Sequence, residues 1–274
     1  MAESRQRWAK PTPTERKKPK GKNKYNEFME IDNIYNMDCL EGMKQIPDGT
    51  IDAVICDLPY GTTANKWDSV IPFDKLWEQY RRICKPNAPI VLFGSEPFST
   101  MLRMINIKAF KYDWIWNKEA SGSGLLANVQ PLKIHEIVSV FAFGTSTFNP
   151  IMTKGAMRNK KSYGSKAGST TGYIKESKDN YNDMYYPKSI VSFSNASQAD
   201  KIHPTQKPVD LLRYLVLTYT NEGDTVLDNC MGSGTTAIAC IKERRHFIGF
   251  ELSKEYFDKA VRRIKAEQAQ LTLF

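Results

Sequence analysis

Short apolar runs that alternate with amphipathic stretches constrain the fold of this 274-residue chain more than any other feature. Runs with the length and composition of buried strands occupy 33–36, 51–56, 89–94, 112–116, 134–143, 225–228 and 246–251. Helical spacing of apolar residues marks 39–46, 73–84, 97–107, 208–219, 235–242 and about 253–268. The alternation predicts an α/β fold with a doubly wound, mostly parallel sheet.

Two parts of the chain lack this alternation. Residues 1–27 are rich in Pro, Lys, Arg and Thr, and they predict a flexible basic arm. Residues 144–200 are rich in Lys, Ser, Gly, Asn and Tyr without a sustained period, and they predict an insertion on the sheet that is not part of its core. One domain made of residues 28–143 and 201–274 is therefore expected, with 144–200 inserted in it.

The net charge of +9 is concentrated in these two parts. Residues 1–24 carry nine Lys or Arg against two Glu, and residues 151–201 carry nine against four acids, so the remainder is slightly acidic. Positive charge confined to two segments indicates that a polyanion is met there. A solvated tail and loop would explain the same composition, and for the arm alone that is the simpler explanation.

Several classes of protein are excluded by composition. The chain has no run of about 18 apolar residues for a membrane span and no apolar core of a signal peptide. Its three histidines are not spaced with acids or cysteines as metal ligands, so no metal site is expected. The five cysteines are scattered without a Cys-x-x-Cys pair, as in a reduced cytoplasmic protein: Cys39, Cys56, Cys84, Cys230 and Cys240.

The stretch Asp57-Leu58-Pro59-Tyr60, called the tetrapeptide below, directly follows the 51–56 strand. Open parallel sheets bind ligands at the edge where such strands end. An acid, two backbone carbonyls fixed by a proline and a flat ring can hold a planar amine. Taken alone, the same residues could equally be a turn that ends a strand.

A second motif surrounds the stretch 229–234, called the glycine loop below. A strand ends in Asp228, the loop contains Gly232 and Gly234, and a helix begins after it. Glu251 follows at the tip of the next strand, where it can accept two ribose hydroxyls. The third glycine of a dinucleotide fingerprint is absent, and Asp228 would repel a pyrophosphate but suits an ammonium or sulfonium. The motif predicts a nucleoside-binding half.

Together these motifs resemble the S-adenosylmethionine-dependent DNA amino-methyltransferases in their permuted β-class arrangement, over most of residues 31–262. The tetrapeptide is similar to the catalytic Asp-Pro-Pro-Tyr of that family, which implies a Rossmann-like methyltransferase sheet with a basic target-recognition insertion at 144–200. The segments 36–40 and 203–208 resemble two further parts of the cofactor site. The resemblance implies S-adenosylmethionine binding by Asp38, Cys39, Thr205, Lys207, Asp228, Gly232, Gly234, Thr235 and Glu251.

The sequence departs from the family pattern at two places. Leu58 replaces the first proline of the commonest tetrapeptide, which frees one φ angle but leaves the carbonyls available. Asn229 and Cys230 stand where the family often has Pro-Phe, so the packing around the cofactor is expected to differ.

The resemblance implies a site-specific methyltransferase acting on the N6 amine of adenine, because an acid rather than serine begins the tetrapeptide. The base would leave the duplex and stack on Tyr60, and its amine would donate to Asp57 and the carbonyls of Leu58 and Pro59. Transfer would be direct, without a cysteine nucleophile. N4-cytosine DNA methylation, RNA methylation and a catalytically silent nucleic-acid-binding module remain alternative functions. A homodimer remains open as the oligomeric state.

Contacts to DNA are expected from the basic insertion and from the polar loop 61–71, whose Lys66 and Trp67 could close over the flipped base. Trp67 could equally be a packing residue. The pair His135-Glu136 heads an apolar strand, so we interpret it as a packed or edge position rather than a proton relay. His203 is expected at the cofactor entry by resemblance alone. The predicted DNA contacts are Lys66, Trp67, Lys154, Arg158, Lys160, Lys161 and Lys166.

Overall fold

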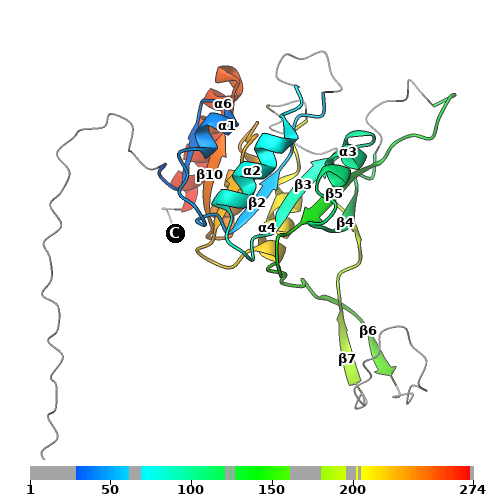
Figure 1. The fold of residues 1–274 in the computed structure, drawn as a ribbon. Coiled ribbons are helices and arrows are strands. Elements are labelled where there is room, and N and C mark those ends of the chain that lie inside the picture. The colour runs from blue at the N-terminus through cyan, green and yellow to red at the C-terminus, as the bar shows by residue number, and fades with distance from the viewer. Residues whose placement is uncertain are drawn as a thin grey trace, which may run out of the picture.

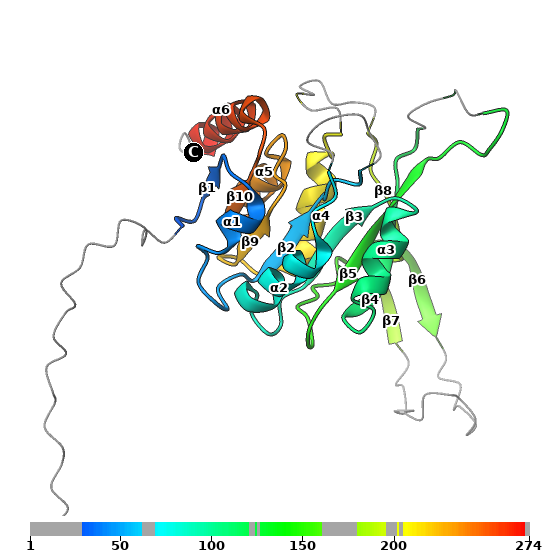
Figure 2. The same ribbon diagram turned by 45° about the horizontal axis from the view of Figure 1, so that its top comes forward.

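The computed structural model describes residues 29–61, 69–120, 124, 127–160, 180–195, 202 and 205–271. Its main sheet contains β1 (Asn33–Tyr35), β2 (Ala53–Cys56), β3 (Ile90–Gly94), β4 (Phe110–Asn117), β5 (His135–Phe141), β8 (Ile190–Ser192), β9 (Thr225–Asp228) and β10 (His246–Phe250). The order across the sheet is β1-β10-β9-β2-β3-β5-β4-β8 (Figure 1; all eight strands are labelled in Figure 2). In this sheet β5 alone runs antiparallel to its neighbours, so the prediction of a mostly parallel sheet is confirmed.

Helices cover both faces of the sheet (Figure 2). They are α1 (Cys39–Met43), α2 (Phe73–Ile83), α3 (Phe98–Ile105), α4 (Val209–Tyr219), α5 (Thr235–Lys242) and α6 (Lys254–Leu271). Successive strand residues point to opposite faces. Val54 therefore packs in one core cluster with Tyr80 of α2, whereas Ile55 packs in the other with Leu215 of α4. The fold is doubly wound, as predicted, and each face has its own hydrophobic core.

The direction of winding reverses between the neighbouring strands β2 and β9. Val54 pairs with Leu227, and the chain leaves β2 toward α2 on one face but leaves β9 toward α5 on the other. In open α/β sheets such a reversal opens a crevice at the carboxyl ends of the two strands. The tetrapeptide follows β2 and the glycine loop follows β9, so the topology brings both motifs to this crevice.

One strand lies where no sheet strand was expected. Residues 144–200 were expected to form an insertion on the sheet that is not part of its core. Within them, β8 joins the edge of the sheet, where it pairs in parallel with β4 from Ile115 with Ile190 to Asn117 with Ser192. The indole of Trp116 also donates to the carbonyl oxygen of Phe193 at 2.9 Å. The strand itself carried no signal in the sequence, because the pairing uses backbone groups, which leave no periodic pattern in so short a strand.

The insertion also contains a separate two-stranded sheet. β6 (Thr153–Lys160) and β7 (Asn180–Tyr185) pair antiparallel, with an irregular register between Lys154 and Arg158, and they extend away from the body in Figures 1 and 2. Their sequences are polar on both faces and therefore show no alternation that would mark them as strands.

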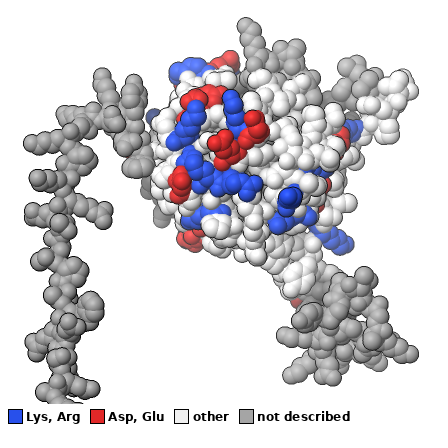
Figure 3. All heavy atoms as spheres, in the orientation of Figure 1, with Lys and Arg blue, Asp and Glu red and all other residues white. Residues whose placement is uncertain are grey.

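Charges of both signs are mixed on the face that carries α1 and α2 (Figure 3). Arg82 lies 2.6 Å from Asp48 there, and Lys44 lies 2.6 Å from Glu41. This agrees with a body whose charge is nearly balanced, while most of the basic excess lies in residues outside the described ranges. No helix within those ranges is long and apolar enough to cross a membrane.

Candidate active site

A cavity of about 500 Å³ lies at the carboxyl ends of β2 and β9. Both motifs line it, as expected from their place at the reversal of the sheet. Of the predicted catalytic and cofactor residues, those that line the cavity are Asp38, Cys39, Asp57, Leu58, Pro59, Tyr60, Thr205, Lys207, Asp228, Gly232, Thr235 and Glu251. Gly234 lies behind them, where it begins α5.

Both carboxylate oxygens of Asp57 receive a donor. The Tyr60 hydroxyl donates to Oδ1 at 2.7 Å, and the Lys207 ammonium donates to Oδ2 at 2.6 Å. The Tyr60 ring packs against Phe98 with 4.9 Å between ring centroids. Leu58 turns into the core, where its side chain is 3% exposed. The tetrapeptide is therefore anchored by its leucine and presents its acid and ring to the cavity.

Lys207 connects Asp57 to a second acid. Its Nζ lies 3.1 Å from Glu136 Oε2, and Lys118 Nζ donates to Glu136 Oε1 at 3.2 Å. The Lys207 side chain is 10% exposed and lies over the rings of Phe93 and Trp116, at 5.2 and 5.9 Å. Two acids and two lysines thus alternate along the wall of the cavity. We call Asp57, Lys207, Glu136 and Lys118 the lysine–carboxylate network.

Burial and pairing shift the proton affinities of this network in opposite directions. Burial raises the pKa of Asp57, while the ammonium of Lys207 opposes that shift. Burial disfavours the charged form of Lys207, but Asp57 and Glu136 outweigh it and raise the pKa of the lysine. Burial also disfavours the charged Glu136, yet Lys207 and Lys118 hold its pKa below the usual range. Lys207 and Glu136 are therefore an ion pair at neutral pH.

Sequence reasoning missed two members of this network. Glu136 was interpreted as a packed or edge residue, which is incomplete, because it lines the cavity between two lysines; His135 beside it is exposed. Since β5 runs antiparallel to β3, its first residues lie at the edge where the parallel strands end. That edge position becomes visible only once the direction of β5 is known. Lys118 directly follows β4 and carried no motif.

The glycine loop has a backbone that needs its glycines. Gly232 and Gly234 have φ angles of +55° and +78°, in the left-handed region that favours glycine. The N–H of Gly232 donates to Glu251 Oε2 at 2.8 Å, and the N–H of Ser253 donates to Oε1 at 2.8 Å. Burial raises the pKa of Glu251. The loop and the acid predicted to meet a ribose are thus fixed against each other.

Asp228 holds the start of the glycine loop. Its Oδ1 accepts from the N–H of Cys230 at 3.1 Å, and its Oδ2 accepts from the Thr236 hydroxyl at 2.6 Å. Burial raises the pKa of Asp228 to about 6. The acid shapes the loop, and its contact with a ligand cation stays a prediction.

The opposite wall is built on α1. Asp38 Oδ1 accepts from the N–H groups of Leu40 and Glu41 at 2.9 and 3.1 Å, so this acid caps the helix while it lines the cavity.

Asn229, at the position of the family's usual proline, is also tied in place. Its Oδ1 accepts from the Tyr80 hydroxyl at 2.5 Å, and its Nδ2 faces the thiols of Cys39 and Cys230 at 3.8 and 3.5 Å. Burial raises the pKa of Cys56 to about 12, which is consistent with a structural thiol rather than a nucleophile.

The predicted DNA contacts are only partly described. Lys66, Trp67, Lys161 and Lys166 lie outside the described residues, as does His203, and Arg158 and Lys160 belong to β6. The Lys154 side chain is 80% exposed and lies 3.5 Å from Asp183 of β7. Within the described ranges no group of three or more His, Cys, Asp or Glu side chains is arranged to hold a metal ion.

Comparison with known sequences identifies the family. The family N6_N4_Mtase, described as DNA methylase, matches residues 51–262, which is more than half of the chain. The Type II methyltransferase M.HpaI of Haemophilus parainfluenzae is 28% identical over 83% of this chain and 72% of its own length. The DNA adenine methyltransferase YhdJ of Escherichia coli (strain K12) is 27% identical over 86% of this chain and 83% of its own length.

Solved structures share the fold. The M1.HpyAVI-SAM complex superimposes with a TM-score of 0.56 at 24% identity, covering 84% of this chain and 98% of that one. The PvuII DNA methyltransferase (cytosine-N4-specific) gives a TM-score of 0.60 at 16% identity, covering 87% and 91%. The sheet is thus of the Rossmann-like methyltransferase kind, and with the match over residues 51–262 the chain belongs to the N6/N4 DNA methylase family, whose members are DNA amino-methyltransferases.

Proposed function

We propose that the protein is a site-specific DNA methyltransferase that moves a methyl group from S-adenosylmethionine to the N6 amine of an adenine flipped out of the duplex. One observation carries the proposal: the tetrapeptide and the glycine loop line the same cavity, at the reversal between β2 and β9. An acceptor for an amine and a cradle for a nucleoside are thereby within reach of each other.

The residues around the glycine loop fit the cofactor. A cavity of about 500 Å³ is large enough for a nucleoside with an amino acid side arm. Glu251 accepts one backbone N–H on each oxygen and retains lone pairs for ribose hydroxyls, and Asp38 can accept from the adenine amine. The anionic Asp228 suits an ammonium group. When bound, S-adenosylmethionine would supply an electrophilic methyl group: the amine lone pair would form the N–C bond as the C–S bond breaks, leaving a neutral thioether, and the methylated amine would then lose one N–H proton.

The tetrapeptide prepares the acceptor. Asp57 and the carbonyl oxygens of Leu58 and Pro59 can accept the N–H bonds of the target amine, which draws its lone pair out of conjugation with the ring. Tyr60 offers a face for the base to stack on. The base has to leave the duplex because pairing and stacking bury its exocyclic nitrogen. Positioning and charge complementarity supply most of the acceleration in this account.

Adenine and DNA are favoured by different observations. The tetrapeptide begins with Asp57, and the relative YhdJ is named a DNA adenine methyltransferase. The cytosine-N4-specific neighbour, at 16% identity, speaks for the fold alone. The basic insertion with the exposed Lys154 suits phosphates, and we assign DNA contacts there to Arg158, Lys160, Lys161 and Lys166, with Lys66 and Trp67 near the flipped base.

A labelled-cofactor assay tests the proposal. The protein is incubated with methyl-labelled S-adenosylmethionine and either unmethylated duplex DNA or RNA, and the product is digested to nucleosides. Label in N6-methyladenine of the DNA is expected. Label in N4-methylcytosine would contradict the adenine assignment, label confined to the RNA would contradict the DNA assignment, and no label in any sample would favour a silent binding module.

A further inference from the structure

Lys207 stands between two carboxylates that face the same cavity. Its Nζ is 2.6 Å from Asp57 Oδ2 and 3.1 Å from Glu136 Oε2. An ammonium this close to Asp57 neutralises the charge of the acid. The proposed reaction needs that charge, because a neutralised carboxylate accepts weakly from the target amine. In the arrangement described here, the ammonium therefore masks the acid.

Glu136 offers the ammonium a second position. Its Oε1 accepts from Lys118 Nζ at 3.2 Å, and its Oε2 lies 3.1 Å from Lys207 Nζ. Within the described residues, Oε2 is a buried acceptor without a directed donor. Buried acceptors of this kind are rare and costly in native structures. A shift of the Lys207 ammonium from Asp57 toward Glu136 would give this oxygen a donor.

We propose that Glu136 is a positioning residue that takes the ammonium of Lys207 away from Asp57 when the target amine enters the cavity. The inference rests on the proposed function and specifies how its acceptor half is switched on. The lysine moves between two acids that it already contacts, so the net charge of the lysine–carboxylate network stays constant. The ammonium keeps a carboxylate partner, and Asp57 exchanges the ammonium for the target amine. The rings of Phe93 and Trp116 flank the ammonium throughout.

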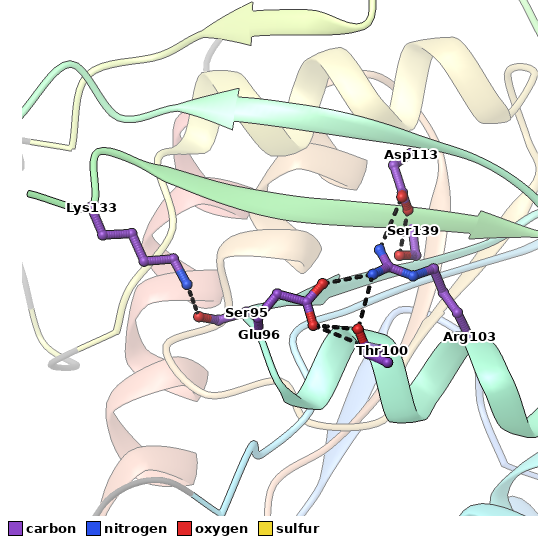
Figure 4. Close-up of polar contacts among 7 residues, drawn as sticks. All are labelled: Ser95, Glu96, Thr100, Arg103, Asp113, Lys133 and Ser139. Atoms are coloured by element: carbon purple, nitrogen blue, oxygen red, sulfur yellow. Dashed lines mark hydrogen bonds and ion pairs between the residues drawn. The ribbon is translucent and has the colours of Figure 1, made fainter. Parts of the chain in front are cut away.

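A second cation bridge in the molecule shows what a purely structural bridge looks like (Figure 4). Arg103 of α3 lies 2.6 Å from Glu96 and 2.9 Å from Asp113 of β4. The Thr100 hydroxyl donates to Glu96 Oε2 at 2.6 Å, and the Ser139 hydroxyl donates to Asp113 Oδ1 at 2.6 Å. These residues do not line the cavity, and each oxygen of the two acids has a directed donor. The Arg103 bridge also joins two acids through one cation, but neither acid has an oxygen that lacks a donor. It therefore provides a control for the Lys207 bridge.

Single-turnover methyl transfer tests the inference. With saturating labelled S-adenosylmethionine and unmethylated DNA, Glu136→Gln should lower the rate constant by up to about 100-fold, because Lys207 then has no anionic second partner. The dissociation constant of the cofactor should stay near the wild-type value, and the variant should remain folded at the assay temperature although the lost ion pair lowers its melting temperature. Glu136→Asp keeps the carboxylate and should recover part of the rate. The control Glu96→Gln makes the same change in the Arg103 bridge and should transfer at the wild-type rate.

A double substitution separates this role from independent catalysis by Glu136. In a Lys207→Gln background, Glu136→Gln should cost no further rate, because Glu136 acts through the lysine. If the rate losses of the two single variants multiply in the double variant, the inference is overturned. A Glu136→Gln protein that transfers at the wild-type rate would also overturn it, and so would a Glu136→Asp protein that is as slow as Glu136→Gln. A wild-type protein that methylates no DNA contradicts the proposed function, whereas an active wild type matched by Glu136→Gln contradicts the inference alone.

Discussion

Lys207 Nζ lies 2.6 Å from Asp57 Oδ2, although 150 residues separate the two in the chain. The contact ties the segment before α4 to the end of β2, and so joins the part of the chain after the insertion to the part before it. The lysine was expected at the cofactor by resemblance. The structure instead sets its ammonium on the acid of the tetrapeptide, and a cofactor contact of Lys207 stays a prediction.

Asp57→Asn is predicted to lower methyl transfer by about 100-fold or more, because the charged acceptor for the target amine is lost. Cofactor affinity should change little, since Asp57 belongs to the acceptor half. Initial rates and cofactor titration by calorimetry measure the two effects. Asp210→Asn, an exposed acid at the start of α4, is the control. An active Asp57→Asn protein would contradict the assignment of the tetrapeptide.

Glu251→Gln is predicted to weaken cofactor binding by about 10-fold or more. The amide retains one acceptor oxygen, so the bond from Gly232 N–H or from Ser253 N–H is lost together with the charge. Calorimetric titration with S-adenosylmethionine measures the change, and Glu255→Gln, an exposed acid on α6, should bind as the wild type does. Equal affinity in both variants would argue against a ribose contact at Glu251.

Gly234→Ala is predicted to destabilise the protein more than Gly223→Ala. Both glycines have strongly positive φ angles, +78° and +82°, so either alanine incurs a strain of about 1–2 kcal/mol. A Cβ on Gly234 would also lie 3.3 Å from Ala260 and Ile264 of α6, whereas a Cβ on Gly223 would meet nothing within 4 Å. Urea unfolding measures both free energies. If both variants lose the same unfolding free energy, the side chains of α6 move away from the added Cβ without an energetic cost.

Asp228→Asn is predicted to flatten the pH dependence of stability between about pH 4 and pH 6. Burial raises the folded-state pKa of Asp228 to about 6, above its ordinary value, so the folded state binds this proton more tightly than the unfolded state does. The resulting stabilisation is complete below the ordinary pKa and is lost as the pH rises through 6, by on the order of 3 kcal/mol. The difference between wild-type and variant unfolding free energies, measured at several pH values, isolates this group. A difference that is constant across the range would contradict the shift.

Periodicity predicted the sheet and its helices because each strand and helix buries a complete face. Val54 and Ile55 illustrate this, since adjacent apolar residues serve different cores and mark a strand buried on both sides. β8 could not be predicted, because Ile190 and its two neighbours are held by backbone pairing with β4.

The site was predictable where a motif coincides with a strand end, as at Asp57 and Gly232. Glu136 and Lys118 were not predicted, because their place at the cavity depends on the antiparallel direction of β5 and on the position of Lys207, which only the tertiary structure shows. Strands can be predicted from the sequence pattern. The direction of each strand in the sheet, which decides whose ends face the same crevice, cannot.

The nature of the methylated nucleoside tests the central claim most directly. Unmethylated duplex DNA is treated with S-adenosylmethionine and either the wild-type protein or Asp57→Asn, digested completely, and analysed by mass spectrometry. The account predicts N6-methyladenine in the wild-type sample and its near absence with Asp57→Asn. N4-methylcytosine in place of N6-methyladenine, or equal N6-methyladenine with both proteins, would contradict it.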